Sequence, residues 1–173
     1  MPEKNTLSKG RSGRNQGRSA TSSGMADLRV RIPMEIKKAW RAAVQVRKRA
    51  YAPYSKFQVG ATVIDERGRQ FHGCNVENAS YGATICAERN AILQAIAAGA
   101  KEIRDVVVVT KMNPPAEPCA LCLQVIGEFA AADARVWLGD VRELREVTGV
   151  SLLLPRHFGP KSLKRGLGRR GSK

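Results

Sequence analysis

Long apolar runs are missing from the sequence, and their absence excludes one class of protein at once. No run approaches the roughly 18 apolar residues of a membrane-spanning helix, so we expect no membrane partner. Residues 1–24 also lack the apolar stretch of a secretory signal peptide. They are rich in arginine and serine and poor in acid, as organelle transit peptides are, but they lack the apolar face that such a peptide needs.

Cysteine is scarce as well. The chain has four cysteines in 173 residues, which is too few for a disulfide scaffold, and nothing in the sequence directs it to an oxidising compartment. In a reducing cytoplasm, clustered cysteines more often bind a metal or take part in catalysis. We therefore predict a soluble cytoplasmic protein.

Acidic residues are nearly absent from both ends of the chain. The whole chain carries 30 Lys and Arg against 15 Asp and Glu, a formal net charge of +15. Residues 1–24 hold five basic residues and one acid, residues 156–173 hold seven basic residues and no acid, and residues 25–155 hold 18 basic and 14 acidic residues. The excess charge belongs to the ends. Such ends bind phosphate-rich polymers weakly, so weak nucleic-acid contact is one interpretation and a flexible solubilising end is the other.

The length suits one domain with its own core. We expect a disordered basic tail at residues 1–24, a folded domain at 25–160 and a second disordered basic tail at 161–173. A translation start at Met25 is an alternative explanation of the first segment. Residues 25–160 contain no internal repeat and no linker that would divide them.

The pattern of apolar residues predicts strands that alternate with helices after an initial helix and hairpin. Such an alternation is typical of an α/β fold in which helices cover both faces of a layered sheet. The expected helices are 33–50, 86–99 and 119–132, with a short helical turn at 151–158, and the expected strands are 57–65, 69–78, 103–111, 134–140 and 145–150.

Two cysteines separated by two residues lie in "PCALCLQVIGEF", residues 118–129, where a helix is expected to begin. A pair of this kind is a redox couple, half of a structural zinc site, or two ligands of a catalytic metal. A structural zinc ribbon needs a second close pair, and the remaining cysteines, Cys74 and Cys86, do not form one.

The segment Cys86-Ala87-Glu88 is informative when it is combined with the later cysteine pair. Zinc deaminases carry a His or Cys followed two residues later by Glu, and then P-C-x-x-C. Here Cys86, Cys119 and Cys122 match the ligands. Three thiolates leave one tetrahedral position of a zinc ion open for water, as a catalytic site requires. Glu88 is not a ligand in this pattern but a general acid and base.

The charge of three thiolates has to be balanced, because they leave a dication with a net charge of −1. Both ligand segments are expected at helix starts, where free N–H groups and the helix dipole lower thiol pKa values. Arg89 adds a full cation next to Glu88, and we expect it just behind the ligands.

Four stretches of the chain resemble the small, homotetrameric, zinc-dependent type of cytidine deaminase, in the cytidine and deoxycytidylate deaminase family. They are "YAPYSKFQVGATV", "GCNVENASYGATICAERNAIL", "PCALCLQVIGEF" and "LLLPRHFGP", and the resemblance as a whole covers about residues 33–160. The resemblance implies a three-layer α-β-α sandwich with a five-stranded mixed sheet. It also implies one zinc ion per subunit and hydrolytic conversion of cytidine or deoxycytidine to the uracil nucleoside, as in pyrimidine salvage.

The same resemblance assigns substrate-binding residues. Asn75 and Glu77 of "NVEN" would hold a ribose hydroxyl, Phe57 would lie against the pyrimidine, and the backbone of Ala87 would read the base edge. Two further residues would reach the site of a neighbouring subunit in a homotetramer: Tyr81 and Phe158.

Some features leave alternatives open. The family usually reads P-C-G-x-C-R-Q, whereas this chain has Ala120 and Leu123, so a cation is missing near the thiolates and the rate and substrate are in question. Cys74 would make the metal structural if it closed a four-cysteine site. The alternative functions are deamination of an aminonucleoside antibiotic or of a nucleic-acid base on the same fold, and a non-catalytic zinc protein that binds RNA through its tails.

Overall fold

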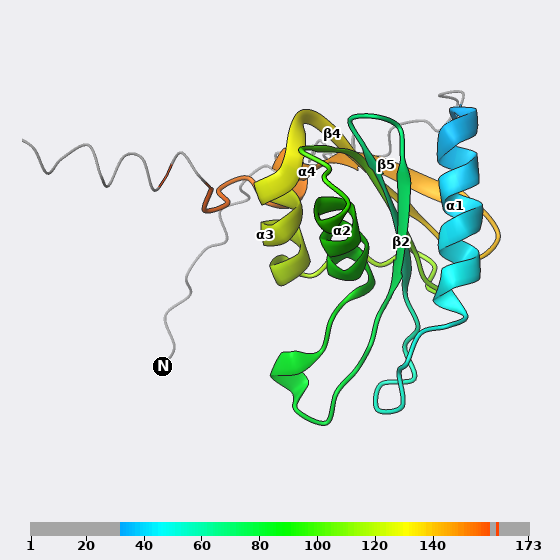
Figure 1. Ribbon diagram of the computed structural model, residues 1–173. Helices are drawn as coiled ribbons and strands as arrows, with labels where there is room; N and C mark the ends of the chain where they lie inside the picture. Colours follow the sequence, from blue (N-terminus) through cyan, green and yellow to red (C-terminus); the bar gives the residue numbers. More distant parts are fainter. Residues whose placement is uncertain (1–31, 160–161, 163–173) are drawn as a thin grey trace, which may run out of the picture.

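The computed structural model of the protein describes residues 32–159 and residue 162 (Figure 1). The predicted tails, apart from residue 162, and the alternative start at Met25 lie outside the described residues. In chain order the elements are α1 (Met34–Arg47), β1 (Gly60–Asp65), β2 (Gln70–Cys74), the 3₁₀ turn η1 (Tyr81–Ala83), α2 (Ala87–Ala97), β3 (Ile103–Val109), α3 (Ala120–Phe129), β4 (Ala130–Gly139), β5 (Leu144–Gly149) and α4 (Val150–Leu153).

The strands form one five-stranded sheet in the order β2-β1-β3-β4-β5. β3 and β4 run parallel, and every other neighbouring pair is antiparallel, so the sheet is mixed. Figure 1 shows α1 on one side of the sheet and α2 and α3 on the other. The predicted α/β class with three layers and a five-stranded mixed sheet is confirmed.

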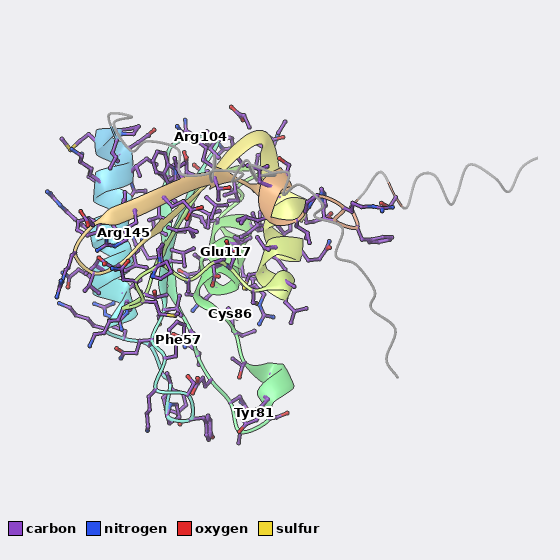
Figure 2. All side chains as sticks on the ribbon, turned by 180° about the vertical axis from the view of Figure 1, so that it is seen from behind. Phe57, Tyr81, Cys86, Arg104, Glu117 and Arg145 are labelled. Atoms are coloured by element: carbon purple, nitrogen blue, oxygen red, sulfur yellow. The ribbon has the colours of Figure 1, made fainter. Side chains whose placement is uncertain are left out.

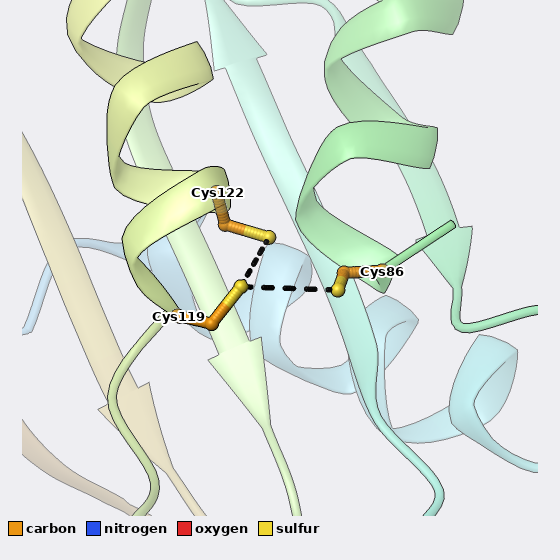
Figure 3. A group of neighbouring side chains, drawn as sticks. All are labelled: Cys86, Cys119 and Cys122. Carbon is orange, nitrogen blue, oxygen red and sulfur yellow. Dashed lines mark hydrogen bonds between the residues drawn. The ribbon is translucent and has the colours of Figure 1, made fainter. Parts of the chain in front are cut away.

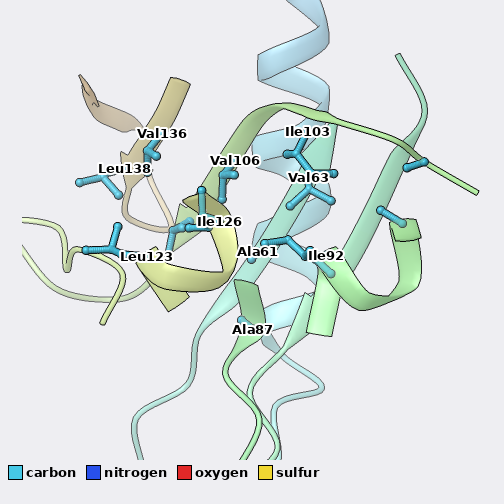
Figure 4. Packing of buried hydrophobic residues seen from close by; sticks show 14 residues of the cluster. Ala61, Val63, Ala87, Ile92, Ile103, Val106, Leu123, Ile126, Val136 and Leu138 are labelled. Carbon is cyan, nitrogen blue, oxygen red and sulfur yellow. The ribbon is translucent and has the colours of Figure 1, made fainter. Parts of the chain in front are cut away.

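Two apolar clusters hold the layers together, one on each face of the sheet. The larger one joins α2 and α3 to the sheet through side chains such as Ile92 and Ile126, packed on Val63 and Val106 (Figure 4). The smaller one lies under α1 and contains the buried Trp137. Strand β1 contributes side chains to both clusters, because successive side chains of a strand point to opposite faces of the sheet.

The end of α3 differs from the prediction. The helix stops at Phe129 instead of residue 132, and β4 already begins at Ala130. Ala130 pairs with Ile103 at the start of β3, so a distant strand removes three residues of good helix propensity from the helix. The first two strands are shorter than expected for a related reason. Phe57 O and Val59 N bond to the Asn75 side chain and Gln58 O accepts from Arg47 Nε, so these residues do not continue the ladder of β1.

Gly73 sets the distance between β2 and α2. A Cβ atom at this position would lie 2.4 Å from the carbonyl oxygen of Ala87 and 2.5 Å from the backbone nitrogen of Ala91. Only glycine therefore lets the start of α2 lie against the strand. The first turn of this helix carries Glu88, so the close approach also fixes the position of that side chain.

Among the described residues, no helix has both the length and the apolar character that crossing a membrane requires.

The β1–β2 turn is stabilised by a buried carboxylate, and this leads to a prediction. Asp65 accepts hydrogen bonds from the backbone N–H groups of Arg67 (3.0 Å) and Arg69 (2.7 Å) and from Arg69 Nε (2.7 Å). Burial acts to raise the pKa of Asp65, but these bonds outweigh it and hold the pKa below its usual value. We expect Asp65→Asn to lower the free energy of unfolding at pH 7 by about 1–3 kcal/mol.

The pH dependence of that effect is a sharper check. Because the folded-state pKa lies below the unfolded one, the stabilisation by Asp65 is present above the unfolded pKa and is lost as pH falls through the folded value. In urea unfolding, the difference between wild type and Asp65→Asn should shrink below about pH 4. A difference that stays constant down to pH 3 would contradict the assigned role.

Candidate active site

Three cysteine side chains meet between the starts of α2 and α3 (Figure 3). Cys86 and Cys119 are the residues that directly precede these two helices, and Cys122 lies in the first turn of α3. The Cys86 Sγ lies 4.0 Å from the Cys119 Sγ, which in turn lies 3.5 Å from the Cys122 Sγ. Cys122 is buried, Cys86 is partly buried and Cys119 is exposed, so the group is reachable from solvent on one side.

This geometry fits a tetrahedral metal ion. With metal–sulfur bonds of about 2.3 Å, two ligands of a tetrahedral zinc site have sulfur atoms about 3.8 Å apart, close to the two separations above. Within the described part of the chain, the three cysteines are the one group of His, Cys, Asp and Glu side chains arranged to hold a metal ion. A tetrahedral ion would keep its fourth position for a molecule from the solvent side.

The environment of Cys86 favours its thiolate form. A hydrogen bond with Cys122 and the neighbouring Arg89 guanidinium lower the pKa of Cys86 to about 5, whereas the pKa of Cys122 is raised by its bond to Cys86 and by burial. Arg89 Nη2 donates to the Thr84 carbonyl oxygen at 2.8 Å and to the Cys86 Sγ at 3.7 Å. Arg89 therefore lies just behind the ligands, where the sequence predicted it.

Glu88 is buried beside this group, with only 4% of its surface exposed. Burial raises the pKa of its carboxyl to about 7, and the charge of the Cys86 thiolate acts in the same direction. A carboxyl group with a pKa near neutrality both accepts and donates a proton at working pH, as a general acid and base must. The site thus places a carboxyl group suited to proton transfer beside a group of thiols arranged for a metal ion.

The comparison with protein families agrees with this chemistry. A family model described as "Cytidine and deoxycytidylate deaminase zinc-binding region" matches residues 33–138. The chain belongs to this family. The metal that the three thiols are suited to hold is accordingly zinc, and the predicted cofactor is confirmed.

Individual relatives of this deaminase support the assignment. A cytidine deaminase of Halalkalibacterium halodurans is 44% identical over 119 residues, which cover 68% of this chain and 89% of the relative. The crystal structure of cytidine deaminase from Burkholderia pseudomallei superposes with a TM-score of 0.67 at 42% identity and covers 70% of this chain and 98% of its own. That of cytidine deaminase from Mycobacterium leprae gives 0.62 at 33% identity, with 72% and 100% covered.

The other interpretations of the cysteine pair fit the structure less well. A redox couple has no use for Cys86, which lies against the pair. A structural four-cysteine site would need Cys74, but Cys74 is not part of the metal-binding group. It lies partly buried on β2, where burial raises the pKa of its thiol.

Asn75 and Glu77 lie beside the cysteine site in this deaminase fold. The segment that carries them runs next to the residue before Cys86, because Val76 and Ile85 exchange backbone hydrogen bonds of 2.8 and 3.0 Å. Asn75 is buried, with its Oδ1 accepting from Val59 N and its Nδ2 donating to Phe57 O, both at 2.8 Å. Asn75 thereby positions the segment that carries Phe57, a contact that the sequence alone did not indicate.

The remaining predicted substrate-binding residues differ in exposure. Ala87 is fully buried as the first residue of α2, and Phe57 is 38% exposed. Tyr81 is 77% exposed and Phe158 is 61% exposed. Figure 2 shows Phe57 and Tyr81 toward the same end of the molecule as Cys86, with Tyr81 on a projecting segment. The structure gathers Ala87 with the cysteines and leaves Tyr81 and Phe158 on the surface.

Two departures from the usual family motif have a simple structural description. Leu123 is buried in the larger apolar cluster with Ile126 and Leu138 (Figure 4), so its side chain contributes to the core and brings no charge to the thiolates. Ala120 is exposed at the start of α3. Arg89 is therefore the cation that the described residues place on the ligands.

Ser55 was given no role by the sequence, although it lies in "YAPYSKF". Its hydroxyl group bonds both Glu77 and the backbone of Phe57. The only signal in the sequence was its position two residues before Phe57.

Proposed function

We propose that the chain hydrolyses cytidine and deoxycytidine to uridine and deoxyuridine with release of ammonia, in cytoplasmic pyrimidine salvage. One observation carries the proposal above all. Glu88 is buried with a pKa of about 7 beside three thiols arranged for zinc. The chain's membership of the deaminase family supports the substrate class, and four free thiols among the described residues support a reducing compartment.

The proposed mechanism assigns the proton transfers to Glu88. Cys86, Cys119 and Cys122 would hold the zinc ion, which would lower the pKa of a water molecule next to the base. Glu88 takes a proton from the attacking water and delivers it to N3 of cytosine while oxygen bonds to C4. It then carries the second proton to the amino group, which leaves as ammonia. Backbone N–H groups at the starts of α2 and α3 stabilise the negative charge that develops.

Substrate recognition is proposed for residues beside the zinc ligands. Glu77 and Asn75 would contact the sugar, Phe57 would lie against the pyrimidine ring, and the backbone of Ala87 would read the base edge. Support comes from the pairing of Val76 with Ile85, which keeps the sugar-binding segment one residue from the first ligand.

A homotetramer is proposed as the working form. Tyr81 and Phe158 are large aromatic side chains that lie mostly exposed, although each belongs to a motif expected to contact substrate. Exposed aromatic residues are enriched at protein interfaces. In a tetramer the two side chains would complete the site of a neighbouring subunit.

The function is tested with purified, zinc-loaded protein by following the loss of cytidine and deoxycytidine absorbance. We expect turnover of both nucleosides, and a sedimentation mass of four chains for the same preparation. A cytosine-containing oligonucleotide serves as the control substrate and should remain unchanged. Zinc-loaded protein that leaves both nucleosides intact would overturn the proposed substrate, and turnover of the oligonucleotide alone would favour the nucleic-acid alternative.

A further inference from the structure

The segment of residues 51–59, which carries Phe57, is held mainly by residues 75–77, with a further bond of 3.0 Å from Arg47 Nε to Gln58 O. Tyr51 N donates to Asn75 O at 3.0 Å, and Glu77 N donates to Tyr51 O at 2.8 Å. The side chain of Asn75 holds the far end of the segment, and that of Glu77 holds its middle. The residues proposed to bind the sugar and the base are therefore parts of one hydrogen-bonded unit.

The middle of this segment needs such support because its backbone is strained. Lys56 has a φ of 57°, in the left-handed region that residues with a side chain rarely adopt. Strain of this kind persists only where surrounding contacts enforce it. The residue that follows is Phe57, so the contacts that maintain the bend also determine where this aromatic ring lies.

Ser55 is at the centre of these contacts. Its Oγ donates a hydrogen bond to Glu77 Oε1 and accepts one from Phe57 N at 3.0 Å. The other carboxylate oxygen, Glu77 Oε2, accepts from the backbone N–H groups of Tyr54 at 2.9 Å and Ser55 at 3.2 Å. The single hydroxyl group of Ser55 thus joins the carboxylate of Glu77 to the backbone of Phe57.

The hydrogen bonds around Glu77 leave room for one more donor. A carboxylate has roughly four acceptor positions, and three are used by Ser55 and Tyr54. The Ser55 hydroxyl and the two N–H groups also hold the pKa of Glu77 below its usual value, so the group stays a pure acceptor. Within residues 32–159, the acceptor position left without a donor is on Oε1, the oxygen that Ser55 bonds.

We propose that Ser55 is a positioning residue for the sugar subsite, which orients the Glu77 carboxylate toward one sugar hydroxyl and couples that contact to the position of Phe57. The proposal rests on the nucleoside deaminase activity proposed above. Ser55 acts through Glu77 and does not itself touch the substrate. Its contribution should consequently be larger for substrates that offer the hydroxyl group than for those that lack it.

The test compares Ser55→Ala with wild type on cytidine, deoxycytidine and 2′,3′-dideoxycytidine. We expect KM for the two hydroxyl-bearing nucleosides to rise about 10-fold with kcat within about twofold, as for loss of a hydrogen bond to a charged group. For dideoxycytidine, which lacks the 2′- and 3′-hydroxyl groups, KM should rise clearly less, because only the effect of Ser55 on the position of Phe57 remains. Retention of the full effect with deoxycytidine would identify the 3′-hydroxyl as the group bound.

Two further variants make the result specific. Ser55→Thr keeps the hydroxyl group and should restore KM for cytidine. Ser151→Ala removes an exposed serine hydroxyl on α4 and should leave all kinetic constants unchanged.

Several outcomes would overturn the proposal. An equal loss on all three substrates would make Ser55 only a structural support of the segment, and no loss on any of them would leave it without a role. Both results require an active wild type, whereas a wild type that deaminates no cytosine nucleoside would refute the proposed function itself.

Discussion

Replacing Glu88 by glutamine is expected to reduce kcat for cytidine by about 10²- to 10⁴-fold, the range that a general acid and base contributes. The substitution keeps the shape of a side chain that is 4% exposed and removes only its ability to exchange protons. Burial raises the pKa of Glu88 to about 7, so the wild-type carboxyl exchanges protons readily near neutral pH. Steady-state kinetics together with zinc analysis of the same preparations measure the effect.

Zinc content and folding should not follow the loss of activity. Glu88 is not one of the three proposed zinc ligands, so Glu88→Gln should bind about as much zinc as wild type and unfold at a similar temperature. Glu128→Gln, at an exposed carboxylate on α3, is the matched control and should keep full activity. Near-native turnover by zinc-loaded Glu88→Gln would rule out Glu88 as the proton carrier.

Removal of Cys122, the buried ligand, is expected to remove almost all metal binding. Cys122→Ala leaves two thiols where three converge, and a zinc ion held by two protein ligands is bound far more weakly. The variant should purify with almost no zinc, show no turnover of cytidine, and lose the stabilisation that a bound metal gives to the folded state. Elemental analysis, the absorbance assay and thermal unfolding measure these three effects.

Cys74 offers a matched control within the same chain. Cys74→Ala removes a thiol that lies on β2 outside the metal-binding group, so zinc content and activity should remain near wild type. Cys119→Ser repeats the experiment at an exposed ligand, where the substitution barely disturbs the packing. This variant tests the ligand set even if Cys122→Ala fails to fold. Stoichiometric zinc in Cys122→Ala, or loss of zinc in Cys74→Ala, would contradict the proposed set of ligands.

The fold was largely predictable wherever the local pattern and the tertiary contacts agree. The helix predicted after Cys86 is one example. It follows a loop, and it ends just before Gly99, a glycine with a φ of +80°. The apolar run at residues 103–111 predicted a strand, and β3 is the central strand of the sheet, with an apolar cluster on each of its faces. The boundary between α3 and β4 was not predictable, because the pairing of Ala130 with Ile103 joins residues far apart in the chain.

The candidate site was predictable to a similar degree. The cysteines and Glu88 could be found from their spacing, because a catalytic zinc site needs particular residue types at the starts of two helices. The contacts of Asn75 and Ser55 could not be found in this way. Each bonds the backbone of residues 57–59, and Ser55 also bonds Glu77, which lies 22 residues further along the chain.

The sequence by itself therefore determined the family of the chain and the residue types of its metal site, and it identified the residue proposed as proton carrier, since these depend on side-chain chemistry and local spacing. Only the tertiary structure decided that Cys86 meets Cys119 at 4.0 Å, that burial raises the pKa of Glu88 to about 7, and that Ser55 donates a hydrogen bond to Glu77. Desolvation and hydrogen bonding depend on which distant groups surround an atom, and that is known only when the chain is folded.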